Sequence, residues 1–334
     1  MLSVVIPVCN EEASLAQLHA ELDEVARGHD YDMEIVLVDD GSTDGTWQQI
    51  EQLTGLDPRV RGIRLRRNFG KAAALRAAFD TVRGDIVFTL DGDLQDDPAE
   101  IPRFLEEMSG EVDLVSGWKK QRHDPWHKVL PSRVFNWLVS RMTGVRLHDH
   151  NCGFKCYRRE VLADVTLYGE MHRFVPVLAA ARGWKIGEIV VNHRPRRHGR
   201  SKYGVGRIVR GFLDLLTVYF VTGFGHRPLH FLGAGGLLCF LIGGAGLTIL
   251  SALWVITRID PFVGEVHLHE KAVFYYCIVA VLLGAQLMSM GFLAELLTAY
   301  FGRDIQPYSI RERAGTITPK HRETEESHEA APRG

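Results

Sequence analysis

The sequence predicts a mostly parallel α/β domain followed by an amphipathic helix and a transmembrane helical hairpin. Three features of the 334-residue chain carry this prediction. Short apolar runs alternate with stretches of helical apolar spacing, which is typical of successive strand–helix–strand units. Polar and acidic clusters follow directly after several of the apolar runs. Two long segments near the C-terminus are almost free of charge, and each exceeds the roughly 20 residues that cross a bilayer.

The N-terminal part of the chain alternates between buried strands and helices. A short apolar run bounded by turn residues indicates a strand buried on both faces, whereas apolar residues three or four apart indicate a helix. On these criteria we expect strands at 3–8, 34–38, 62–65 and 85–90, and helices at 15–25, 46–53 and 71–82. Such units form a parallel sheet with right-handed crossovers, and ligands bind beyond the carboxyl ends of its strands.

The middle of the chain has more mixed patterns. We expect a strand at 114–116, a helix at about 131–142, a polar loop at 147–153, further elements at 174–181 and 186–191, and a basic stretch at 193–202. From residue 205 an apolar stripe recurs at helical spacing, while Arg207, Arg210 and Asp214 lie off that stripe. This pattern predicts an amphipathic helix that lies in a membrane interface, and we assign it to 205–227.

The segments at about 231–256 and 272–300 predict two transmembrane helices within 228–302. Basic residues gather before the first and after the second, whereas the link carries only Arg258 and Lys271. By the positive-inside rule the domain at 1–204 and the tail at 303–334 are both cytoplasmic, at the cell (inner) membrane, and the polar end of the tail is expected to be disordered. The alternative is a buried hairpin of a soluble protein, which the charge-free length disfavours. The glycine-rich first span would permit close helix packing, and we expect a homo-oligomer.

Composition narrows the function classes. The formal net charge of −2 provides no global field for nucleic acid, so no nucleic-acid partner is expected. The five cysteines fit neither a disulfide framework nor a zinc site, and we expect thiols in a reducing compartment. The chain begins directly with a strand and lacks a leader pattern, so we expect that the first domain is not secreted.

The acidic motif Asp91-Gly92-Asp93 follows the fourth predicted strand. Two carboxylates two residues apart on a turn can reach one cation, and Mg²⁺ or Mn²⁺ held in this way also accepts diphosphate oxygens as ligands. Such an ion neutralises the charge that develops on a leaving nucleoside diphosphate. A solvated acidic turn is the alternative, and for an isolated motif of this kind it would be the favoured one. Here the motif is one of a set.

Two further members of the set follow the first two strands. Asp39 and Asp40 end the second strand, where a carboxylate can accept from a base imide or a ribose hydroxyl. Pro7 and Glu11, at the end of the first strand, are candidates to pack on a base and to meet a ribose. The alternatives are helix capping by Ser42 or Asp44 and an ordinary strand-to-helix junction.

Two basic motifs complete the set. The run 66–71 places polar groups between the third strand and a helix, and the run 197–203 combines clustered cations with a glycine, which suits a phosphate clamp. For each of these runs the alternative is an ordinary solvated basic loop. The second run also precedes the predicted interfacial helix, where basic side chains meet anionic lipid headgroups.

Taken in order, these motifs resemble glycosyltransferase family 2 and, within it, the polyprenyl-phosphate (dolichol-phosphate-like) glycosyltransferases. The resemblance covers 1–225 and extends to about 300 through the paired spans. The residues that carry it are Val5-Ile6-Pro7 with Asn10-Glu11, Val38-Asp39-Asp40-Gly41-Ser42, Asn68-Phe69-Gly70-Lys71, Asp91-Gly92-Asp93-Leu94-Gln95 and Gly199-Arg200-Ser201-Lys202-Tyr203.

The resemblance implies a GT-A type, Rossmann-like catalytic domain, a divalent metal and inversion at the anomeric carbon. It implies that Asp91, Asp93 and Gln95 surround the metal, that Asp39 or Asp40 meets the base, and that Arg200 and Lys202 touch phosphate. Asp149, in the loop that resembles the acceptor side of this subgroup, is the candidate base. The implied catalytic residues are thus Asp149, Asp93, Arg200 and Lys202. The other implied substrate contacts are Pro7, Val8, Glu11, Asn68, Lys71, Gly92, Arg122, Ser132, Arg133, Ser201 and Tyr203.

The chain departs from the family pattern at one position and lacks one signature. Asp97 stands where the family usually has a proline after the position of Asp96. The Gln-x-x-Arg-Trp signature of processive synthases is absent, which argues against polymerisation. His148 and His150 are expected to be loop residues rather than metal ligands. For Arg122 and Arg133, a capping or surface arginine is an equal alternative.

These observations predict an enzyme that moves a hexose-type sugar from a UDP- or GDP-linked donor to polyprenyl phosphate, for cell-envelope glycan or lipid modification. A lipid phosphate is already an anion near pH 7, so positioning and charge neutralisation should matter more than a base. One alternative is a transferase with a hydroxyl acceptor, for which Asp149 would be essential. The other is a non-catalytic membrane scaffold.

Overall fold

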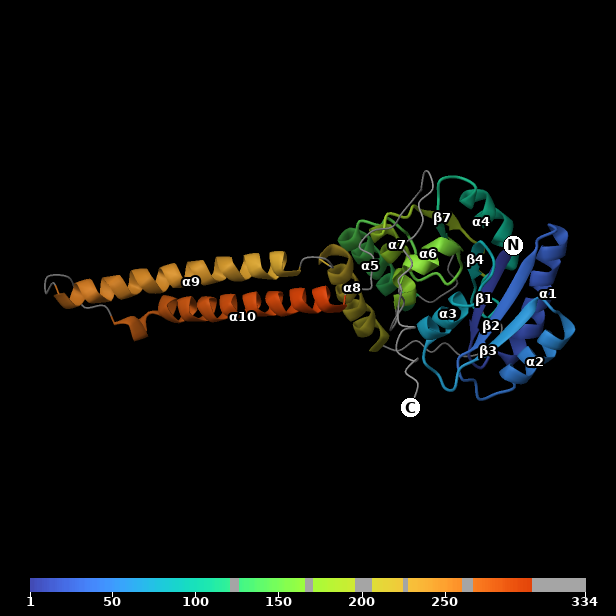
Figure 1. Cartoon of the computed structure of the whole chain (residues 1–334), viewed down its shortest axis with the longest axis horizontal. Coiled ribbons are helices and arrows are strands. Elements are labelled where there is room, and N and C mark those ends of the chain that lie inside the picture. The colour runs from blue at the N-terminus through green and yellow to red at the C-terminus, as the bar shows by residue number, and fades with distance from the viewer. Residues whose placement is uncertain (121–125, 166–170, 196–205, 225–227, 260–266, 302–334) are drawn as a thin grey trace, which may run out of the picture.

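The computed structural model describes residues 1–120, 126–165, 171–195, 206–224, 228–259 and 267–301. A seven-stranded sheet lies between two layers of helices, and a long helical hairpin projects from one side of this domain (Figure 1). The order of the strands in the sheet is β3-β2-β1-β4-β6-β5-β7. Their bounds are Leu2–Val8 for β1, Met33–Asp39 for β2, Val60–Arg64 for β3, Ile86–Thr89 for β4, Leu114–Trp118 for β5, Lys155–Arg158 for β6 and Ile186–Val190 for β7.

The parallel arrangement expected for the N-terminal part is confirmed. β1 pairs in parallel with both β2 and β4, and β2 pairs in parallel with β3. β2 is buried along its whole length because it has a strand on each side and helices above and below. The turns after β1, β2 and β4 therefore meet at one edge of the sheet.

The strand β6 was not expected, and it departs from the parallel pattern. It pairs antiparallel with both β4 and β5, so that Lys155 lies opposite Thr89 on one side and Ser116 on the other. Its four residues, Lys155 to Arg158, have a charged residue at each end, and such a short run carries no clear strand signal. Two flanking strands supply its hydrogen bonds, so long-range pairing determines this element rather than local propensity.

Helices cover both faces of the sheet. The bounds of those in the α/β domain are Glu12–Gly28 for α1, Thr46–Leu56 for α2, Lys71–Phe79 for α3, Ile101–Met108 for α4, Trp126–Thr143 for α5, Arg159–Asp164 for α6 and Val175–Ala181 for α7, with short 3₁₀ turns η1 at Pro98–Glu100 and η2 at Met171–Phe174. One core cluster joins the sheet to α1, α2 and α4, and a second joins it to α3, α6 and α7. This layering is the expected consequence of strands that are apolar on both faces.

The helix α8 (Gly206–Phe224) connects the α/β domain to the hairpin. Leu215 and Val218 are buried in a small cluster with side chains of α5 and α7, whereas Phe212 and Leu213 are exposed. A helix therefore lies within the predicted range 205–227, and one of its faces packs on the domain while apolar side chains remain exposed elsewhere on it.

The hairpin consists of α9 (Pro228–Ile259) and α10 (Ala272–Phe301), with the 3₁₀ turn η3 (Leu268–Glu270) before α10. Both helices are long and apolar enough to cross a membrane, and only 6% and 11% of their most apolar windows are buried within the protein. The backbones approach closely at Gly243, where an added Cβ would lie 2.7 Å from Cys277 O. Glu295 accepts a hydrogen bond from Leu229 N at 3.2 Å and so holds the start of α9 against α10.

The close approach at Gly243 predicts a matched pair of substitutions. Gly243→Leu should force α9 away from α10, because its side chain would meet the backbone at Cys277 and Val281. Overpacking typically costs about 1–3 kcal/mol, so the apparent melting temperature of the full chain in detergent should fall. The neighbouring Gly244→Leu is the control, since nothing lies within 4 Å of a Cβ at Gly244. Equal melting temperatures for the two variants would contradict this account of the hairpin.

Candidate active site

The turns after β1 and β2 are tied together at the carboxyl edge of the sheet. Asn10 Oδ1 accepts a hydrogen bond from Thr43 N at 2.8 Å, and Asn10 N donates to Ser42 Oγ at 2.9 Å. Asp39 Oδ1 accepts from Ser42 N at 2.8 Å and so shapes the same turn. Gly41, at φ +69°, is required there because an added Cβ would lie 2.4 Å from the carbonyl carbon of Arg67. The turn that contains Asp39 and Ser42 is therefore held in one shape by hydrogen bonds from and to its neighbours.

Asp39 and Asp40 have different roles in this turn. Asp40 accepts hydrogen bonds from Phe69 N at 2.7 Å and Gly70 N at 2.9 Å, so both of its oxygens hold the loop that precedes α3. Asp39 Oδ2 accepts no hydrogen bond from the described residues, although Arg64 Nε lies 3.4 Å away. The sequence predicts that Asp39 or Asp40 meets a nucleotide base. In the structure Asp39 keeps its Oδ2 as an acceptor, whereas both oxygens of Asp40 hold the loop before α3.

The acidic turn, residues 91–97, follows β4. Asp91 Oδ1 contacts the ammonium of Lys71 at the start of α3. Burial alone would raise the pKa of Asp91, but the positive charges of Lys71 and Lys119 hold this pKa well below its usual range. Asp93 Oδ1 accepts from Gln95 N at 3.2 Å, and Leu94 between them has the left-handed φ of +62°. The turn thus presents the Asp91 carboxylate in its ionised form at the sheet edge.

A buried ion pair supports the turn from inside. Asp96 is 1% exposed, and its Oδ1 lies 2.8 Å from Lys119 Nζ, just after β5. Burial would lower the pKa of Lys119, but the charge of Asp96 reverses this effect and raises the pKa above its ordinary value. Asp96 Oδ2 also lies 3.4 Å from Asp91 N. Lys119 therefore remains charged beneath the turn, a role that the sequence reasoning missed.

The loop 147–153 lies against the acidic turn. The approach is so close at Gly153 that an added Cβ would lie 2.6 Å from Asp91 Oδ2. Glu188, on β7, shapes this loop. Its Oε1 accepts hydrogen bonds from His148 N at 2.8 Å and Asp149 N at 3.1 Å, and its Oε2 lies 2.6 Å from His148 Nδ1. Asp149 itself is 1% exposed, and its Oδ1 accepts from Asn151 N at 3.1 Å. Glu188 was also missed, and its only sequence signal is a carboxylate inside the element predicted at 186–191.

Buried basic groups lie around Asp91 and the loop 147–153. Lys155, on β6, is 3% exposed, its ammonium contacts Cys152 O, and burial lowers its pKa. Burial, with Lys71 nearby, also lowers the pKa of His172 in η2. His150 Nε2 lies 3.1 Å from Ser140 Oγ, and burial lowers the pKa of His150 to about 4. Lys155 ends the segment 148–155, which resembles the acceptor-side loop of the subgroup, but β6 and η2 were not predicted, and the sequence pattern gave no sign that His172 would lie here.

The remaining predicted residues lie at several places. Val8 is buried and packs under Gly92, since a Cβ there would be 2.7 Å from Val8 Cγ1. Asn68 is exposed with its Nδ2 3.3 Å from Cys9 Sγ, and Glu11 N donates to Thr46 Oγ1. Pro7 is partly buried at the end of β1, and Ser132 and the exposed Arg133 lie on α5. Arg122, Arg200, Ser201, Lys202 and Tyr203 lie outside the described residues.

The acidic turn suits a divalent cation that keeps part of its ligand shell. Asp91 already holds one cation, the Lys71 ammonium, and Asp93 comes from the same turn. Gln95 Nε2 lies 3.5 Å from Arg194 O. With the amide nitrogen on that side, the amide oxygen of Gln95 is the atom that could accept a cation. No group of three acidic, histidine or cysteine side chains among the described residues forms a complete metal cage. Two carboxylates and an amide oxygen fit Mg²⁺ or Mn²⁺, whose other ligands are water or diphosphate.

Comparison with known proteins identifies relatives over nearly the whole chain. The glycosyl transferase family 2 domain matches residues 3–166. A dodecaprenyl-phosphate galacturonate synthase from Rhizobium johnstonii is 38% identical over 318 residues, which are 93% of this chain and 92% of that protein. An undecaprenyl-phosphate 4-deoxy-4-formamido-L-arabinose transferase from Aeromonas hydrophila is 33% identical over 334 residues, which are 98% of each chain.

Solved structures confirm the GT-A type fold of the α/β domain. Glucosyl-3-phosphoglycerate synthase from Mycobacterium tuberculosis, in complex with Mn²⁺, UDP and phosphoglyceric acid, matches with a TM-score of 0.53 and 18% identity, over 66% of this chain and 78% of that chain. At this identity the likeness concerns the fold alone. The sequence relatives match nearly the whole chain at 33–38% identity. The chain therefore belongs to glycosyltransferase family 2, in which it resembles polyprenyl-phosphate sugar transferases over nearly its whole length.

Proposed function

We propose that this protein transfers a sugar from a nucleotide-sugar to polyprenyl phosphate at the cytoplasmic face of the inner membrane. The observation that carries the proposal is the convergence of three turns at one sheet edge, which places Asp39 and the Lys71–Asp91 pair at that same edge. The names of the relatives, which specify dodecaprenyl and undecaprenyl phosphates, support the acceptor class. They name galacturonate and 4-deoxy-4-formamido-L-arabinose, so uronic acids and amino-pentoses join hexoses as candidate sugars for a UDP- or GDP-linked donor.

The proposed reaction needs little acid–base chemistry from the protein. A phosphate oxygen of the acceptor attacks the anomeric carbon, a new C–O bond forms, and the bond to the nucleoside diphosphate breaks with inversion. The acceptor is already an anion near neutral pH, so no proton has to be removed from it. Catalysis then depends on in-line positioning and on neutralising the leaving diphosphate. The chain's own contributions are the Lys71 ammonium at the edge and the residues that hold the acidic turn in shape.

Asp91 and Asp93, with Gln95, would hold the Mg²⁺ or Mn²⁺, and such an ion supplies charge stabilisation to a departing diphosphate. The proposal assigns Lys71 to the same region, where its ammonium can exchange Asp91 for a phosphate oxygen. The Mn²⁺ complexes of the glucosyl-3-phosphoglycerate synthase support a metal in this fold, since that enzyme binds Mn²⁺ together with UDP. Lys119 lies beneath the turn and keeps Asp96 paired.

The membrane part of the proposal rests on exposed apolar surface. α8 exposes Phe212 and Leu213, and α5, which packs against it, exposes Val134 and Trp137. Both helices lie at the end of the domain from which the hairpin projects (Figure 1). We therefore propose that 205–227 lies in the interface, that α9 and α10 span the bilayer, and that 1–204 and 303–334 are cytoplasmic. This placement would keep the site within reach of an acceptor confined to the membrane.

A donor panel tests the reaction class. Purified full-length protein in detergent, with undecaprenyl phosphate and Mn²⁺, should transfer label from one radiolabelled nucleotide-sugar into the organic phase. The panel should include UDP- and GDP-linked hexoses, a uronic acid and an amino-pentose. Nucleotide release without lipid label would keep the transferase but contradict the phosphate acceptor. The absence of nucleotide release with every donor would favour the scaffold alternative.

Substitution of Asp93 tests the acidic turn. Asp93→Asn should reduce kcat by roughly 100-fold or more, because it removes a charged ligand of the ion proposed to stabilise the leaving diphosphate, and the loss of one preorganised stabilising group costs about that much. The change is isosteric, so the melting temperature should stay close to that of the unsubstituted protein. Asp80→Asn, at the exposed end of α3, is the control and should retain full activity. An unchanged kcat in Asp93→Asn would remove the turn from the mechanism.

Substitution of Asp149 separates the two acceptor classes. In Asp149→Asn the side-chain oxygen can still accept from Asn151 N, so the loop should keep its shape. With a phosphate acceptor we expect kcat to fall by less than about 10-fold, because general base catalysis, typically worth 10²–10⁴-fold, is not needed. A loss of activity beyond 100-fold, restored in part at high pH, would instead favour a hydroxyl acceptor.

A further inference from the structure

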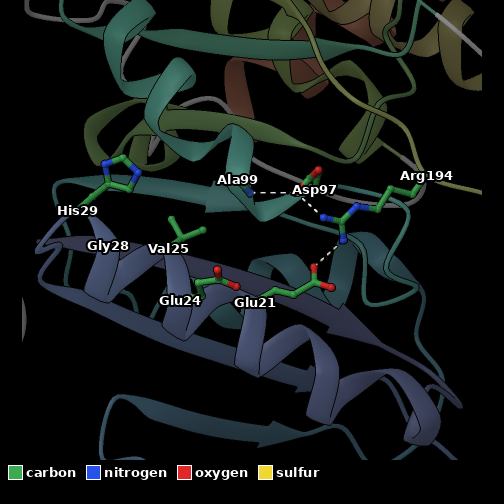
Figure 2. A pocket seen from close by; sticks show the side chains of 8 residues that line it. All are labelled: Glu21, Glu24, Val25, Gly28, His29, Asp97, Ala99 and Arg194. Carbon is green, nitrogen blue, oxygen red and sulfur yellow. Dashed lines mark hydrogen bonds and ion pairs between the residues drawn. The ribbon is translucent and has the colours of Figure 1, made fainter.

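Arg194 joins separate parts of the fold beside the acidic turn. Its guanidinium nitrogens lie 2.6 Å from Glu21 Oε2 on α1 and 2.7 Å from Asp97 Oδ1 (Figure 2). These side chains line a cavity of about 310 Å³ between α1 and η1. The side chains of Glu21 and Asp97 are only 20% and 13% exposed, so this arrangement is better shielded than an ordinary surface ion pair.

The backbone of the same residue pairs with the turn. Arg194 N donates to Gln95 O at 2.9 Å, and Gln95 Nε2 lies 3.5 Å from Arg194 O. The preceding residue, His193, forms an antiparallel bridge with Asp96. Asn192 adds a hydrogen bond from its Nδ2 to Asp97 Oδ2 at 3.1 Å. The segment after β7 therefore runs alongside the turn and is fixed to it by both backbone and side chains.

The acidic turn needs such external support. Leu94 is held at φ +62°, a conformation that costs a residue with a side chain on the order of 1–2 kcal/mol. The turn also gathers four carboxylates within seven residues, from Asp91 to Asp97, and their mutual repulsion opposes a compact shape. Lys119 neutralises the turn from inside through Asp96, and Arg194 does so from outside through Asp97. A strained conformation persists only when the surroundings determine it.

We propose that Arg194 is a positioning residue that fixes the acidic turn against α1 and so sets the geometry in which Asp91 and Asp93 bind a divalent cation. Arg194 acts through the turn, by its ion pair with Asp97 and its backbone bond to Gln95. Glu21 serves as its anchor on a long helix of the main core. The inference rests on the proposed metal-assisted transfer, and its test measures metal binding directly as well as activity.

The test compares Mn²⁺ binding by the full chain and by Arg194→Met, in detergent with UDP or GDP present, from the electron paramagnetic resonance signal of free Mn²⁺. Changes to the partners of metal ligands typically cost 10- to 100-fold in affinity, so the apparent Kd for Mn²⁺ should rise at least about 10-fold. The Mn²⁺ concentration needed for half-maximal activity should rise in parallel. Arg194→Lys keeps one ion pair at most and should give an intermediate Kd.

Arg59→Met provides the matched control. Arg59 also bridges a residue of α1, Asp23, to a loop carboxylate, Asp57, and its exposure of 34% is close to the 29% of Arg194. It lies just before β3, at the amino edge of the sheet and away from the acidic turn. Both variants should lower the melting temperature, but only Arg194→Met should weaken Mn²⁺ binding.

Two results would overturn the assignment. If Arg194→Met and Arg59→Met bind Mn²⁺ as tightly as the unsubstituted protein, Arg194 is a structural ion pair and does not set the geometry of the turn. If both weaken Mn²⁺ binding equally, the effect is general destabilisation. Failure of the unsubstituted protein to bind Mn²⁺ is a separate outcome, because it would remove the proposed metal site and this role of Arg194 with it.

Discussion

The central constraint in this structure is the concentration of negative charge in the turn after β4. Four of its residues are aspartates, and repulsion between carboxylates so close together opposes a compact turn unless cations lie nearby. The fold supplies those cations from three directions. Lys71 comes from the start of α3, Lys119 follows β5, and Arg194 follows β7. Elements that are distant in the sequence are therefore linked through one short turn.

This arrangement explains how the sheet topology serves the site. β4 lies beside β1 in a parallel pair, which brings its turn next to those that follow β1 and β2. On its other side β4 pairs with the antiparallel β6, which places Lys155 and the loop that precedes it behind Asp91. The antiparallel strand thus joins the half of the sheet proposed to bind the nucleotide to the half beside which Asp149 and Glu188 lie. The proposed donor and acceptor regions therefore meet at the antiparallel strand β6.

Much of this could be predicted from the sequence because the signals were local. The buried strands before residue 90, the turn at Gly41, the acidic motif and the two apolar segments each depend on residues close together in the chain. Elements set by distant partners were missed. β6 is too short to show a pattern, and Lys119 and Glu188 matter only because of the aspartate and the loop opposite them. Asp97, noted only as a departure from the family pattern, proves to be the residue that Arg194 holds.

The most direct test of the account is to locate the metal. Crystals of the full chain grown with Mn²⁺ and the nucleoside diphosphate should show an anomalous scattering peak at the manganese edge beside Asp91 and Asp93. The Lys71 ammonium should then have moved from Asp91 to a phosphate oxygen. A peak at another place in the protein, or a bound diphosphate with no metal at the turn and Lys71 still on Asp91, would contradict the claim that this turn is the centre of the reaction.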